Sequence, residues 1–234
     1  MMPAIPLHAR VLWAVLKPSA AFTVVLPLAF GGWMYLVRSD PLQIEAVAGA
    51  ALILQMFTVS TGYLDRLRRG YFDPILVAPS ARLNVAWAHW VISVAPGLAT
   101  WVAIAIVDAW LRPGRLPVAL TPPALAAFFW VSAASWFLSL PTRRYAGGGL
   151  WLVVFMALGA SQQLLTLRAV FRTAGDGWAA GARAALCAWV FPLLMLSEPP
   201  SIQTQIIVLA GACGVLIAGL VFVVRADAAL QDSV

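Results

Sequence analysis

The chain has 234 residues, of which 62% are hydrophobic and only 10% charged, with a mean hydropathy of +0.90 and a pI near 10.2. A soluble domain carries about a quarter charged residues, so this composition excludes an ordinary water-soluble protein and predicts a membrane protein. The fourteen arginines and one lysine stand in short stretches between apolar runs. That distribution is typical of membrane topology and excludes the clustered basic patch of a nucleic-acid-binding protein.

The N-terminal region predicts a surface helix followed by a first span. Residues 1–19 are expected to form an amphipathic helix on the membrane surface, because Leu7, Val11 and Val15 can share one face. The run 20–37 is long enough to cross, since about 20 apolar residues reach across the hydrocarbon. No small-x-small cleavage site follows this run, so we expect a retained span and not a signal peptide.

Six further apolar runs follow, at 42–61, 83–110, 120–140, 147–166, 178–196 and 202–224. We expect one all-α polytopic domain over 1–234 with six transmembrane helices and a cytoplasmic N-terminus, which leaves more arginine and lysine inside than outside. Arg183 and Pro192 interrupt the run 178–196, which we expect to enter the membrane and return. If that run crosses fully instead, the C-terminus lies outside.

The segment 62–82 is the longest charged stretch, and the topology puts it in the cytoplasm between the second and third helices. Leu64, Leu67 and Ile75 recur at helical spacing and give one apolar stripe. Gly70 can end the first helical piece, so the pattern predicts a broken amphipathic helix. On charge alone, a loop that sets topology and touches lipid headgroups is the better explanation.

The order of residues in this segment resembles the ABC-2 type permease family. That family has a Gly, an acid three residues on, a Leu-Leu pair, a Pro, a small residue and an Arg between its second and third helices. The matching residues are Gly70, Asp73, Ile75, Leu76, Pro79, Ser80 and Arg82. Departures are Asp73 where Glu is usual, Tyr71 where a small hydroxyl residue is common, and Pro74 within the motif. Size and layout are also similar to the haem-exporter B subunit of cytochrome c maturation.

The resemblance implies a permease subunit of an ATP-driven ABC exporter in a bacterial inner membrane, working as a dimer with itself or a similar chain. The loop then acts as a coupling helix seated on a separate ATPase subunit, which binds ATP and Mg. The implied coupling residues are Leu64, Asp65, Arg66, Leu67, Arg68, Arg69, Gly70, Asp73, Ile75, Leu76, Pro79 and Arg82. The chain has no Gly-x4-Gly-Lys-Ser/Thr, so no cofactor is expected in it and the phosphate cradle has to come from the partner.

Ionisable residues within spans are functional candidates, because each costs roughly 2.5–3.5 kcal/mol at a helix centre. Glu45 and Asp108 stand near the outer ends of the second and third spans, where both are expected to reach lipid headgroups. His89 is expected near the interface, with a haem or proton role left open. No metal site is expected. Intramembrane glutamines more often bridge helices than bind substrate: Gln55, Gln162 and Gln163.

Three other functions compete with the exporter. An ion-coupled secondary transporter needs a mid-membrane charge or broken helices in two matching halves, and neither is found. A membrane enzyme on lipid-linked substrates needs clustered Asp, His or Glu at one membrane face. An assembly factor on such substrates stays open. The outward loops are short, and a hydrophobic or lipid-like cargo suits an apolar path.

Overall fold

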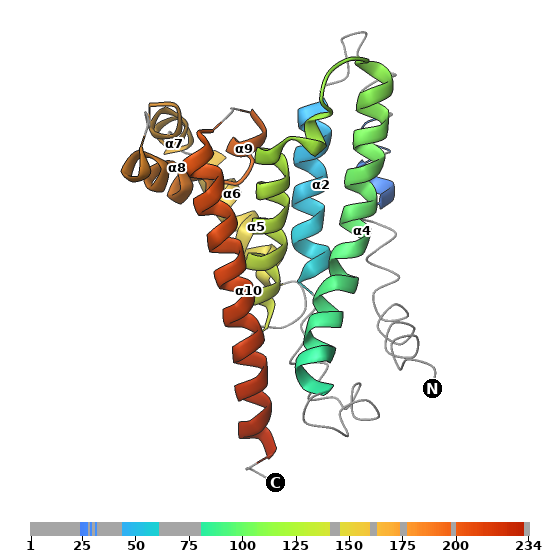
Figure 1. Ribbon diagram of the computed structural model, residues 1–234, viewed down its shortest axis with the longest axis vertical. Helices are drawn as coiled ribbons and strands as arrows, with labels where there is room; N and C mark the ends of the chain where they lie inside the picture. The colour runs from blue at the N-terminus through green and yellow to red at the C-terminus, as the bar shows by residue number, and fades with distance from the viewer. Residues whose placement is uncertain are drawn as a thin grey trace.

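The computed structural model describes residues 24–27, 29, 31, 44–60, 81–140, 146–159, 163–173, 177–197 and 200–231. Every regular element within these residues is helical, which confirms the expected all-α class (Figure 1). The expected surface helix at 1–19 lies outside the described residues. So does most of the expected first span at 20–37, in which the few described residues are helical.

Three helices are long and apolar enough to cross a membrane: α4 (Ala81–Leu111), α5 (Pro122–Ser139) and α10 (Ile202–Gln231). The apolar helix α2 (Ile44–Val59) is shorter. These four helices coincide with predicted apolar runs, because the hydrocarbon thickness fixes how long an apolar run must be. The described part of the chain is therefore that of a helical membrane protein with three candidate spans, and the total of six stays a prediction.

The structure also has four shorter helices. Helix α6 (Ala146–Gly159) lies in the run 147–166, whereas α7 (Gln163–Arg172) begins near the end of that run and extends past it. Helices α8 (Trp178–Val190) and α9 (Leu194–Ser197) coincide with the run 178–196. Pro192 lies in the turn between α8 and α9, where the sequence predicts a break, because proline has no N–H to continue a helix. Helices α7, α8 and α9 gather at the end of the bundle where α10 begins, which we call the α7–α9 end (Figure 1). Membrane re-entry of 178–196 stays a prediction.

A tight turn and the one-turn 3-10 helix η1 (Val118–Leu120) join α4 to α5. Gly114 lies in this turn with φ of +83°, a left-handed conformation that glycine adopts without a Cβ clash. Helix α5 then begins with Pro122 and Pro123. Proline suits the first turn of a helix, because the N–H groups there have no partner within the helix.

Helices α2, α4, α5 and α10 lie alongside one another (Figure 1). Helix α10 packs against α5 and α8, and α2 packs against α4 and α5. Helix α2 runs away from the α7–α9 end, and α4 begins at the opposite end (Figure 1). The segment 61–80 therefore connects two helices that are packed against each other.

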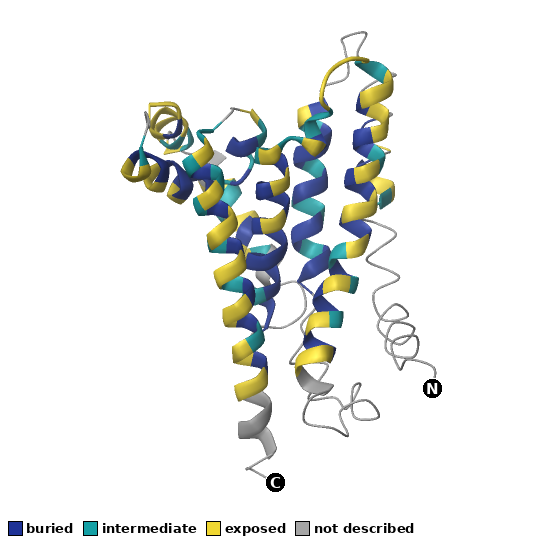
Figure 2. Ribbon diagram, viewed as in Figure 1, coloured by how far each residue is buried: buried dark blue, intermediate teal, exposed yellow. Residues whose placement is uncertain are grey.

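Burial follows the helix faces (Figure 2). Large side chains that are fully buried point into the bundle, among them Leu52, Trp101 and Trp136. The outer face of α10 carries exposed apolar residues instead: Ile202, Ile206, Leu209, Ile217 and Val221. Exposed apolar surface on this scale marks contact with lipid or with another protein, which fits a membrane-embedded bundle.

Two glycines of α10 let tryptophan rings approach its backbone. A Cβ added at Gly219 would lie 2.7 Å from Cζ3 of Trp136, and one added at Gly211 would lie 2.6 Å from Cζ2 of Trp189. The ring of Trp136 is fully buried and has no room to move away. Small residues at such contacts are how membrane helices pack closely, because lipid tails supply no hydrophobic force between helices.

We predict that Gly219→Ala lowers the stability of the folded protein by about 1–3 kcal/mol, the usual cost of overpacking a core. Gly214→Ala in the same helix is the matched control, since a Cβ there meets nothing within 4 Å. Both variants gain the same helix propensity, so their difference isolates the contact with Trp136. Thermal unfolding in detergent measures it, and equal melting temperatures for the two variants would contradict this packing.

Candidate functional site

The structure describes the helices on both sides of the predicted coupling loop, and little of the loop itself. Eleven of the twelve predicted coupling residues lie outside the described residues: Leu64, Asp65, Arg66, Leu67, Arg68, Arg69, Gly70, Asp73, Ile75, Leu76 and Pro79. Arg82, the twelfth, belongs to the first turn of α4. On the α2 side, the Ser60 hydroxyl donates to the carbonyl of Met56 at 2.6 Å and helps to close the helix. Coupling by this loop therefore stays a prediction.

A cluster of three charged residues lies where α2 begins and α4 ends. Nε of Arg112 donates to Oδ1 of Asp108, and Nη1 of Arg112 donates to Oε1 of Glu45 at 3.3 Å. These residues form the acid–arginine cluster, which links α2 to α4 across 67 positions of sequence. Hydrogen bonding to Asp108 raises the pKa of the Arg112 guanidinium above its usual value. Opposite charge and donated hydrogen bonds thus hold the two helix ends together.

Asp108 also fixes the connection to the next helix. Its second oxygen, Oδ2, accepts a hydrogen bond of 2.6 Å from the backbone N–H of Val118, the first residue of η1. Close by in sequence, Nε1 of Trp101 donates to the carbonyl of Ala119 at 2.6 Å. A carboxylate that accepts from a backbone N–H and from a guanidinium is well compensated, which explains how Asp108 is buried with an exposed fraction of 1%.

The cluster corrects one expectation and adds one residue. Asp108 does not reach outward to headgroups, because its carboxylate turns inward to Arg112 and Val118. Glu45 does stay accessible, with 45% of its side chain exposed. Arg112 was not predicted as a site residue. Its place four residues after Asp108, with the acid first, is the favourable helical pairing and could have identified it.

His89 is buried, whereas the sequence predicted a position near the membrane interface. Its exposed fraction is 0%, and Nδ1 accepts a hydrogen bond of 3.3 Å from Nε1 of Trp136 on α5. The difference arises because position along a span says nothing about which helix face a residue occupies. His89 lies on the face of α4 that packs inward, together with Ser93 and Thr100.

Gln55 bridges two helices, as predicted. Its Nε2 donates to Oγ of Ser132 at 3.2 Å, joining α2 to α5 in the buried interior. Gly97 of α4 lies so close that a Cβ added there would be 1.9 Å from Oε1 of Gln55. Only glycine fits beneath this amide, next to Pro96, which interrupts the hydrogen bonding of α4. Three helices thus meet at one polar point.

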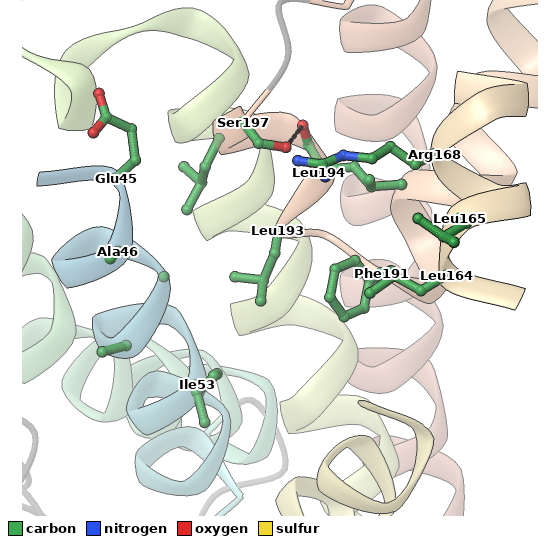
Figure 3. Close-up of a pocket in the computed structure, with 13 residues that line it drawn as sticks. Glu45, Ala46, Ile53, Leu164, Leu165, Arg168, Phe191, Leu193, Leu194 and Ser197 are labelled. Atoms are coloured by element: carbon green, nitrogen blue, oxygen red, sulfur yellow. Dashed lines mark hydrogen bonds between the residues drawn. The ribbon is translucent and has the colours of Figure 1, made fainter. Parts of the chain in front are cut away.

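A cavity of about 480 Å³ lies at the α7–α9 end, between α2, α7 and the segment from Phe191 to Ser197 (Figure 3). Most of its lining is apolar: Ala46, Gly49, Ala50, Ile53, Leu164, Leu165, Phe191, Leu193, Leu194 and Leu196. Its polar side chains are Glu45 on α2, Arg168 on α7 and Ser197 on α9. Glu45 therefore belongs to both the cavity and the acid–arginine cluster.

Comparisons with known proteins identify no relative: no protein-family model, no curated protein and no solved structure matches this chain. The family resemblance of the segment 62–82 therefore rests on its own residues.

We predict that Gly97→Ala destabilises the protein by about 1–3 kcal/mol, because the new methyl group displaces Gln55 from Ser132. In a Gln55→Ala background the same Gly97→Ala change is expected to cost much less, since the clashing amide is gone. Gly149→Ala serves as the control, because open space surrounds that position. Unfolding midpoints in detergent, measured with and without each substitution, give a double-mutant cycle. An equal loss of stability from Gly97→Ala in both backgrounds would show that the Gln55 amide is not the obstacle.

We predict that Arg112→Gln costs about 2 kcal/mol, because it leaves the Asp108 carboxylate buried without its cation. The loss stays below the roughly 3–5 kcal/mol of a fully buried pair, since Arg112 is one-third exposed. Adding Asp108→Asn is expected to recover part of the loss, because no buried charge is then left unpaired. Arg115→Gln, at an exposed arginine of the same turn, is the control. Additive losses in the double variant would argue against the pairing.

Proposed function

We propose that this chain is the transmembrane permease subunit of an ATP-driven exporter of the ABC-2 type. The permease forms the translocation path as a dimer, with itself or a similar chain, in a bacterial inner membrane. The observation that carries the proposal is the residue order from Gly70 to Arg82, which follows the apolar helix α2 and ends in the first turn of the apolar helix α4. ATP and Mg bind to a separate ATPase subunit, which contacts residues 62–82.

The helices on both sides of this segment support the proposal. Helices α2 and α4 pack against each other, and both also contact η1. A force applied to the segment that joins them would act on both helices at once. In the proposed mechanism, ATP binding brings two ATPase subunits together, and the coupling segments transmit this rigid-body motion to the spans.

The acid–arginine cluster keeps one end of α2 joined to one end of α4 while the two helices move. Glu45 of α2 and Arg112 at the end of α4 pair with each other, opposite to the end of the bundle where α2 ends and α4 begins. Asp108 holds the same arginine and the start of η1. Helices α2 and α4, joined at this end, would tilt as one body when the coupling segment moves, opening or closing the path beside them.

The test is co-purification in detergent followed by an ATPase and export assay. We expect an ATPase subunit with a Walker A motif to accompany the chain. Asp73→Lys is expected to abolish most export while hydrolysis continues, because reversing the charge disturbs the docked segment and not the ATPase site. The amount of chain inserted in the membrane should not change.

Arg115→Glu is the control, a charge reversal at the opposite end of α4 that should leave export coupled to hydrolysis. Purification without any ATPase partner, or transport that continues without ATP, would overturn the proposal and favour a carrier or a membrane enzyme. Unchanged export in Asp73→Lys would count against coupling through residues 62–82.

A further inference from the structure

The outer surface of α4 carries one long apolar stripe. In the fully described stretch from Trp87 to Trp110, every exposed residue is apolar (Figure 2). Exposed residues recur there every three or four positions, which places them along one side of the helix. We call this side the α4 stripe, and its members are Trp87, Val91, Ala95, Leu98, Val102, Ile106 and Trp110.

The polar residues of the same stretch face the interior of the bundle. Each of them has an exposed fraction of 1% or less: His89, Ser93, Thr100 and Asp108. A helix on the surface of a water-soluble protein shows the opposite arrangement, with its polar face outward. Polar residues within membrane helices do face the bundle interior, because hydrocarbon offers them no hydrogen bonds. The segregation along α4 therefore indicates apolar surroundings for the stripe.

The length of the α4 stripe matches the thickness of a bilayer. Trp110 follows Trp87 by 23 positions, which is about 34 Å along a helix that rises about 1.5 Å per residue. A tilt of about 20°, the average for membrane helices, projects this length onto about 32 Å. The hydrocarbon core of a bilayer is about 30 Å thick. The two tryptophans are therefore spaced to lie at its two boundaries.

Both ends of the α4 stripe carry the residues of a membrane interface. The side chains of Trp87 and Trp110 are exposed, and tryptophan is enriched where hydrocarbon meets headgroups. Polar residues begin directly beyond them, with the exposed Asn84 before Trp87 and with Arg112 and the exposed Arg115 after Trp110. This order of apolar, aromatic and polar residues follows the cross-section of a bilayer in both directions. A protein partner gives no reason for the same order at two ends.

Helix α10 gives the same length independently. None of its exposed residues from Ile202 to Val224 carries a charged, amide or hydroxyl group, and the exposed Arg225 follows directly. Val224 follows Ile202 by 22 positions, about 33 Å of helix. Because α4 and α10 run in opposite directions, Arg225 lies toward the same end of the bundle as Trp87 (Figure 1). Two helices thus present apolar bands of equal height.

We propose that the α4 stripe contacts the acyl chains of the bilayer directly, with Trp87 at one membrane interface and Trp110 at the other. The middle of the bilayer then lies level with Leu98. The acid–arginine cluster lies at an interface, because Asp108 and Arg112 stand on either side of Trp110 in sequence. Lipid covers this side of α4, so the proposed dimer contact uses another surface. The inference does not depend on the exporter function, since lipid contact needs no ATPase.

Site-directed spin labelling tests what covers the stripe. The full chain, with Cys187 and Cys213 replaced by alanine, receives single cysteines along the stripe and beyond its ends, and is placed in phosphatidylcholine nanodiscs. We expect collisions with oxygen, which dissolves in hydrocarbon, to be most frequent for Leu98→Cys. Collisions with a water-soluble nickel chelate should be most frequent for Asn84→Cys and Arg115→Cys.

The same profile identifies the other occupants. Frequent nickel collisions at Leu98→Cys would show that water covers the stripe. Rare collisions with both reagents along its whole length would show that a protein covers it, such as a second copy of the chain. Either result would overturn the proposal.

A matched pair of arginine substitutions tests depth. The side chains of Leu83 and Leu98 are both 48% exposed, but Leu83 lies one turn outside Trp87 and Leu98 at the middle of the stripe. We expect Leu98→Arg to lower the folding equilibrium constant in bicelles about a hundredfold, the cost of a charge at the centre of a membrane helix. Leu83→Arg should change it less than about tenfold, because its guanidinium reaches the headgroups.

Equal losses in the two arginine variants would overturn the proposal, since depth would then have no effect. Complete loss of folded Leu98→Arg beside folded Leu83→Arg, judged by gel filtration, agrees with lipid at the stripe. The cysteine variants carry no charge, so their spin-label profile decides independently between lipid and a protein partner.

Discussion

The bundle depends on one constraint, which is that helices with apolar outer faces have no hydrophobic force to hold them together in lipid. Close contact and a few polar bonds have to do it instead. Glycine at 219 lets the backbone of α10 lie against the ring of Trp136. The buried amide of Gln55 reaches Ser132 across the interior, and glycine at 97 leaves room for it. Each contact works only with a residue of one size.

Polar groups at the end of the bundle have a different role from those inside it. The Asp108 carboxylate binds the guanidinium of Arg112 and the backbone of η1, so it joins the end of α4 to the turn between α4 and α5. Glu45 connects this anchor to α2 and also lines the cavity. In the proposed exporter, a change in the tilt of α2 would therefore alter the cavity wall.

The positions of the helices could be predicted from the sequence, because apolar run length and proline breaks are local properties. Helices α2, α4, α5 and α10 lie where apolar runs indicated, and the α8–α9 break lies at Pro192. The bridging role of Gln55 was also predicted. The burial of Asp108 and His89 could not be, since it depends on which face of α4 meets its neighbours. The cavity could not be predicted from the sequence either, because its walls come from segments more than 100 residues apart.

We propose that residues 62–82 bind an ATPase supplied by another chain. A photoactivatable amino acid at Ile75, compared with one at Leu116 in the exposed turn after α4, tests it most directly. We expect the probe at Ile75 to cross-link a Walker A ATPase in intact membranes, and the yield to change when ATP is bound. The probe at Leu116 should give no such product. An absent ATPase cross-link from Ile75, or an equal one from Leu116, would show that residues 62–82 do not bind an ATPase.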